Sequence, residues 1–135
     1  MRILGMSAAV LALAGCSIGK AVPAAEDAAT SFHHMLNAGR FADTYAQAAP
    51  DLRAATPQDK WLKRLGAVHA RLGREQWAKT AGWNDNFTNG RHFVVLDQDV
   101  QYEHGLAREK LTFRIDGEKP SLAGYRVSAD GQALN

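Results

Sequence analysis

Five histidines and one cysteine are the side chains in this chain best suited to metal or nucleophilic chemistry. His33 and His34 are adjacent, so on a helix their side chains diverge by about 100° and cannot hold one ion together. His69, His92 and His104 lack both an i,i+4 histidine partner and a supporting cysteine. We therefore expect ordinary surface or half-buried histidines, with no metal site and no cofactor.

The cysteine, Cys16, stands at the end of the run Leu13-Ala14-Gly15-Cys16, which resembles a bacterial lipobox. Arg2 and a short apolar run before it have the anatomy of a secretory signal. That run is too short for a stable membrane span. We expect signal-peptidase recognition of Leu13, Ala14 and Gly15, removal of residues 1–15, and lipidation of Cys16. The alternative is a buried N-terminal helix with an incidental cysteine.

Lipidation at Cys16 would attach a diacylglycerol thioether and an amide-linked chain such as palmitate. Several acyl chains together make anchoring effectively permanent. Ser17 stands where aspartate is the familiar inner-membrane retention signal, so we expect the protein on the outer membrane, facing the periplasm. Residues 16–24 would form the lipidated tether.

Composition narrows the class of protein further. The chain has 135 residues, of which 46% are apolar, a length that fits one domain. Its 16 basic residues are scattered among 14 acidic ones, which argues against a nucleic-acid partner. Catalytic signals are also weak: no serine occupies a strand-turn-helix elbow, and the glycines stand singly rather than in a phosphate-binding loop.

Periodicity changes once along the chain. Apolar residues recur at helical spacing over residues 24–37, 40–49 and 57–72, and Gly73 follows the last of these. Beyond Gly73 the period is two, and Asn89-Gly90 is a strong hairpin signal. Later strands are expected near residues 92–103, 108–116 and 122–128. These patterns predict an α+β domain over residues 25–128, with three N-terminal helices on a curved four-stranded antiparallel sheet, and a frayed tail over residues 129–135.

This order of elements resembles the cystatin-like, nuclear-transport-factor-two-like cone fold. More narrowly, it resembles an uncharacterised family of small proteobacterial envelope lipoproteins. The stretches that carry the resemblance are residues 41–50, 61–73, 109–113 and 122–125. Because some enzymes on this cone transfer protons with an Asp or Tyr in its mouth, Asp51, Tyr45 and Tyr102 are candidates. The tyrosines could equally be core residues.

Five residues could mark a pocket in the cone. Trp77 and Trp83 share parity on one strand and either line a hydrophobic pocket or fill the core. By parity, Gln98, Tyr102 and Glu109 lie on faces that are otherwise apolar. A buried Glu109 would need hydrogen bonds, an Arg partner or a raised pKa. Alternatively, Glu109 points past the sheet edge into water, and a bulge turns Gln98 outward.

Two functions from different classes remain open. The first is a lipid-anchored, non-enzymatic module that binds a small molecule, a lipid or an envelope protein. The second is a small acid/base enzyme, of isomerase or hydrolase type, that works inside the cone. Whether the concavity is open and polar or filled with side chains distinguishes them.

Overall fold

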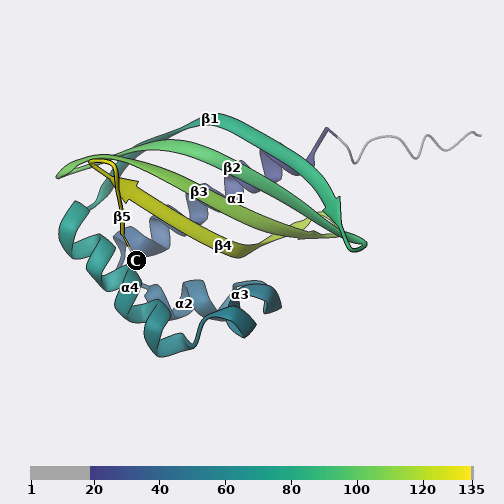
Figure 1. The fold of residues 1–135 in the computed structure, drawn as a ribbon, viewed down its shortest axis with the longest axis horizontal. Helices are drawn as coiled ribbons and strands as arrows, with labels where there is room; N and C mark the ends of the chain where they lie inside the picture. The colour runs from purple at the N-terminus through teal and green to yellow at the C-terminus, as the bar shows by residue number, and fades with distance from the viewer. Residues whose placement is uncertain (1–18, 135) are drawn as a thin grey trace, which may run out of the picture.

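A layer of helices packs on one face of a curved antiparallel sheet (Figure 1). The computed structural model describes residues 19–134. Within this range four helices precede the strands: α1 (Ala21–Asn37), α2 (Phe41–Ala46), α3 (Pro50–Ala55) and α4 (Gln58–Leu72). The α+β class expected from the sequence is confirmed.

The sheet of residues 19–134 has five strands in the order β1-β2-β3-β4-β5, all antiparallel. They are β1 (Glu75–Thr88), β2 (Arg91–Tyr102), β3 (Gly105–Asp116), β4 (Lys119–Ala129) and β5 (Gln132–Ala133). Asn89 and Gly90 join β1 to β2 with φ angles of 54° and 75°, as the Asn-Gly signal predicts. Because the order is linear, β1 and β5 remain the two edges.

The core lies between the sheet and the helices. From α1 come Ala25, Ala29, Phe32 and Leu36, one stripe at helical spacing. From β2 come Val94, Leu96, Val100 and Tyr102, the alternate residues that the period of two places on one face. Trp61 of α4 and Phe113 of β3 complete the centre, and both are buried. The space between the curved sheet and the helices is therefore filled by side chains around its middle.

Three expected boundaries differ from the structure. The first helix begins at Ala21, inside the stretch expected to be tether. Pro50, which directly follows the helix expected over residues 40–49, starts a further helix, α3, because proline fits the first helical turn. The tail expected to be frayed contains β5, and the Leu134 amide donates to the Val127 carbonyl at 2.9 Å. The described residues thus add one helix and one strand to the expected set.

A β-bulge in β1 separates the two strand tryptophans. The register shifts between Thr80 and Gly82, so one extra residue enters β1 there. Trp77 pairs with Gln101, on the outer face of the sheet, whereas Trp83 pairs with Leu96, on the helix-covered face. The expectation that Trp77 and Trp83 share a face is wrong, since an extra residue reverses side-chain parity.

The sheet also extends beyond the helix that covers it. A 14-residue strand spans about 46 Å, whereas a 17-residue helix spans about 25 Å. Because Asn37 at the end of α1 bonds Glu75 at the start of β1, the hairpin end of β1 and β2 is the end that α1 leaves uncovered. Trp83 and Phe87 lie in this uncovered part and are 60% and 72% exposed, although their strand partners face the helices.

Candidate functional site

A surface pocket of about 600 Å³ lies where the uncovered hairpin meets the first turn of α1. Its apolar walls include Trp83 and Phe87 of β1 and Ile115 of β3. Its remaining lining residues are Lys20, Ala21, Ala24, Asp85, His92, Gly117 and Glu118. This volume falls within the range of small-molecule sites, about 300–1,000 Å³.

An acid/base pair forms part of the pocket wall. His92 Nε2 lies 2.5 Å from Asp85 Oδ1, and both side chains are about one-fifth exposed. The Phe87 ring stacks on the imidazole, with centroids 4.4 Å apart and planes inclined by 15°. An aspartate bonded to one imidazole nitrogen fixes the orientation of the ring. The pair can therefore donate or accept a proton at the pocket wall.

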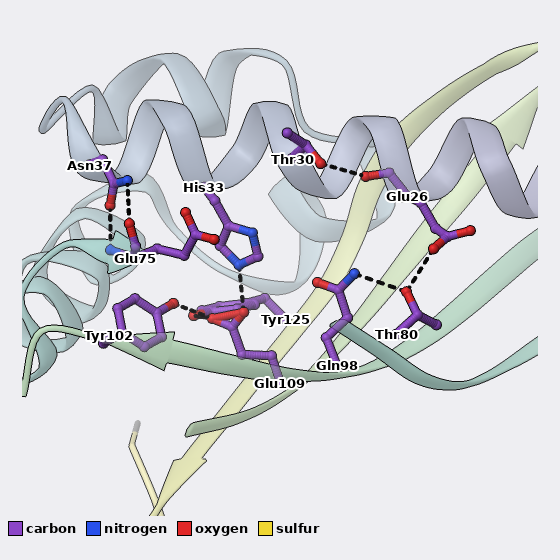
Figure 2. A network of polar contacts seen from close by, with 10 residues as sticks. All are labelled: Glu26, Thr30, His33, Asn37, Glu75, Thr80, Gln98, Tyr102, Glu109 and Tyr125. Carbon is purple, nitrogen blue, oxygen red and sulfur yellow. Dashed lines mark hydrogen bonds and ion pairs between the residues drawn. The ribbon is translucent and has the colours of Figure 1, made fainter. Parts of the chain in front are cut away.

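A second polar group, centred on Glu109, is buried between α1 and the sheet (Figure 2). Glu109 Oε1 accepts hydrogen bonds from the Tyr102 hydroxyl at 2.5 Å and the Tyr125 hydroxyl at 2.6 Å. His33 Nε2 of α1 lies 2.7 Å from Oε2. Glu109 has 0% exposure, so the alternative in which it points into water is wrong.

The pKa values of His33, Tyr102 and Tyr125, the three partners of Glu109, are all raised. Burial disfavours the charged imidazolium of His33, but the hydrogen bond and charge of Glu109 outweigh burial and raise the His33 pKa above 6.5. Burial and the nearby Glu109 charge raise the pKa of both Tyr102 and Tyr125. Both phenols therefore stay neutral donors at physiological pH, and His33 keeps its proton to a higher pH than an ordinary histidine.

Two further polar contacts tie α1 to the sheet on either side of His33 (Figure 2). Near the start of the helix, the Thr80 hydroxyl donates to Glu26 Oε2 at 2.8 Å and lies 3.3 Å from Gln98 Nε2. At its end, the Asn37 side chain bonds both the amide and the carbonyl of Glu75. Together with the Glu109 group, these contacts join α1 to the sheet along one polar line, which we call the seam.

The five residues expected to line one pocket are divided among three places. Trp83 lines the surface pocket, and Trp77 lies on the outer sheet face. Gln98, Tyr102 and Glu109 are buried in the seam, and Gln98 stays inward because the bulge forms in β1, opposite it. None of these three lines the surface pocket.

The other acid/base candidates also lie outside the pocket lining. The Tyr45 hydroxyl donates to the Thr56 carbonyl at 2.9 Å and helps to close α3. Asp51 Oδ1 pairs with Arg114 Nη1 at 3.0 Å, an interaction that lowers the Asp51 pKa. Residues 13–16, the expected lipidation motif, lie outside the described residues.

Sequence reasoning missed Asp85 and Phe87 and treated His92 as an ordinary histidine. The hairpin signal itself could have found them. A two-residue turn at Asn89-Gly90 sets Phe87 opposite His92 and places Asp85 on the same face as a diagonal neighbour. What no local pattern indicates is that α1 begins too far along the sheet to cover them.

No protein-family model, curated protein or solved structure matches this chain. Over residues 19–134, no group of three or more His, Cys, Asp or Glu side chains could hold a metal ion. The helices of the same range are each too short or too polar to cross a bilayer.

Proposed function

We propose that this protein is a lipid-anchored envelope module that binds a small, mostly apolar ligand, without catalysing a reaction, in the pocket lined by Trp83, Phe87 and Ile115, here called the Trp83 pocket. The anchor would be Cys16, placed on the outer membrane and facing the periplasm, and the fold would be a cystatin-like, nuclear-transport-factor-two-like cone. The lipobox-like run supports the anchor. The order of helices and the curved sheet supports the cone.

The observation that carries the binding role is the exposure of Trp83 and Phe87 inside a concave surface. Large aromatic side chains at 60% and 72% exposure leave apolar area in water that a ligand would cover. The centre of the cone offers no such room, since Trp61, Phe113 and Tyr102 fill it. A ligand is therefore expected at the hairpin end of the sheet.

Labelling with adamantyl diazirine, a small apolar photoprobe, tests the binding role on the full protein in its membrane. Trypsin releases residues 75–79, which hold Trp77, and residues 80–91, which hold Trp83 and Phe87. We expect labelling of the second fragment, reduced by Ala24→Trp, which fills the pocket from α1. Equal labelling of both fragments, unaffected by Ala24→Trp, would show that the pocket binds nothing apolar.

The Asp85–His92 pair favours one second candidate, a small hydrolase or isomerase that works in this pocket. A positioned His–Asp pair is a general-base arrangement. A panel of ester and enolisable ketone substrates tests this candidate. Turnover lost in His92→Gln but kept in His69→Gln, a histidine outside the pocket, would support it. A parent protein with no turnover above buffer would exclude it for those substrates.

A further inference from the structure

The pocket lies beside the point where the tether enters the domain. Lys20, the N-cap residue of α1, and Ala21, its first residue, both line the pocket. Cys16 precedes Lys20 by four residues, and four residues span at most about 14 Å. If Cys16 is lipidated, as the proposed function holds, the mouth of the pocket cannot lie far from the bilayer surface.

The exposed aromatic residues fit such a location. Trp83 and Phe87 project from the same hairpin end of the sheet. Tryptophan is enriched at the boundary between lipid headgroups and acyl chains, where an amphipathic ring lies at headgroup depth. Trp77 is comparably exposed but lies on the opposite sheet face, outside the pocket lining. Trp77 is therefore a matched control for Trp83.

The residues that line the pocket combine apolar and charged side chains, the combination that suits an amphiphile. Trp83, Phe87 and Ile115 offer an apolar surface for a hydrocarbon chain. Lys20 and Glu118 add exposed charges of both signs, and the Asp85–His92 pair adds a hydrogen-bonding wall. A ligand with a polar head can form hydrogen bonds or ion pairs with these groups, whereas a purely apolar ligand cannot.

From these observations we propose that the Trp83 pocket holds one long acyl chain of a single-chain amphiphile, taken from the membrane that anchors the protein. This inference rests on the proposed binding function and names its ligand class. The chain lies against Trp83, Phe87 and Ile115, and the polar head lies among the charged groups. Free fatty acid and lysophospholipid share this chemistry.

The test uses the full lipidated protein in vesicles of phosphatidylethanolamine and phosphatidylglycerol. Two photoactivatable acyl probes are compared, a diazirine fatty acid and a diazirine lysophosphatidylethanolamine, alongside adamantyl diazirine. We expect acyl labelling of residues 80–91 in excess over residues 75–79. The probe that labels more strongly identifies the source of the chain.

Three variants sharpen the result. Trp83→Ala and Ala24→Trp should each lower acyl labelling of the pocket about tenfold, the effect expected when one aromatic contact is lost or its space is filled. Trp77→Ala should leave that labelling unchanged. Circular dichroism of each variant verifies the fold, and Ala24→Trp keeps the test valid if Trp83→Ala fails to fold.

The outcomes separate the two proposals. Pocket labelling by adamantyl diazirine but by neither acyl probe would overturn the acyl ligand and leave the binding function standing. Labelling by none of the three probes would overturn both. Acyl labelling that is equal in parent and Ala24→Trp would show contact with the bilayer rather than occupancy of the pocket, and would also overturn the acyl ligand.

Discussion

Glu109 shows how one buried carboxylate can be accommodated without a cavity or a metal. Its two oxygens receive three partners from three elements: His33 of α1, Tyr102 of β2 and Tyr125 of β4. Each partner reduces the cost of removing the charge from water. Because the group is fully paired and sealed, its role is to position α1 on the sheet.

Two neighbouring substitutions should therefore have unequal effects. Glu109→Gln removes one charge of a buried pair, and we expect a loss of about 3 kcal/mol of unfolding free energy. Gln98→Leu should change it by less than about 1 kcal/mol, because a Gln98 oxygen that is buried without a partner among the described residues disappears with the amide. Urea unfolding measures both. Similar losses in the two variants would contradict this account of the seam.

The raised pKa of His33 predicts the pH dependence of stability. A folded pKa above the unfolded value of 6.5 means that the native state binds more protons in the interval between them. The contribution of His33 is thus full below pH 6.5 and is lost as pH rises through its folded pKa.

We expect the parent to lose unfolding free energy across that interval relative to His33→Gln. Denaturant titrations at a series of pH values provide the measurement. His34→Gln, an exposed neighbour, is the control and should follow the parent. Parallel pH profiles of parent and His33→Gln would mean that the ion pair does not form.

At the scale of elements, the link between α4 and the sheet depends on a backbone shape that favours glycine. Gly73 ends α4 with φ of 77°, and an added Cβ would lie 3.0 Å from Glu103 Cβ and 3.1 Å from His104 Cδ2. The backbone there is also fastened, because the His104 amide donates to the Leu72 carbonyl at 3.0 Å. With any other residue at position 73, neither the strain of the positive φ nor the close contact of the added Cβ could relax without moving the turn.

Alanine at two glycines should then have opposite effects. We expect Gly73→Ala to cost about 2 kcal/mol of stability. Gly66→Ala, inside α4, should add about 1 kcal/mol, since glycine is a poor helix former and the nearest atom to the new Cβ is 3.9 Å away. Thermal melting compares the two variants. A stable Gly73→Ala protein would show that the turn is free to move.

At the scale of the whole molecule, the proposed anchor can be tested directly. We expect mass spectrometry of the purified protein to show a chain that begins at Cys16 and carries acyl groups. Cys16→Ser should move the protein from the membrane fraction to the unanchored fraction. A chain that still begins at Met1, or a free thiol at Cys16, would refute lipidation.

Folding of the whole domain should not depend on a metal ion. Apart from the adjacent His33 and His34 of α1, the histidines of the described region lie on different segments of the chain, and His33 and His92 already pair with carboxylates. We expect the melting midpoint to be the same with and without a chelator. A fall of many degrees on chelation would reveal a structural ion, because the binding energy of such an ion is part of the folding energy.

Local sequence was enough to determine the class of fold and much of the core. The alternation of Val94, Leu96 and Val100 predicts their common burial, because successive side chains of a strand point to opposite faces. The Asn89-Gly90 pair predicts the hairpin, because its two residues accept positive φ. Each of these features depends on residues close together in the chain.

Only the tertiary structure decided the candidate site. The bulge between Thr80 and Gly82 moves Trp83 to the face opposite Trp77, and a bulge reflects how β1 pairs with β2 rather than the composition of β1. The partners of Glu109 come from positions up to 76 residues away. The pocket exists because β1 is longer than α1. This difference in length involves two elements that are distant in the chain, so no pattern within either one contains it.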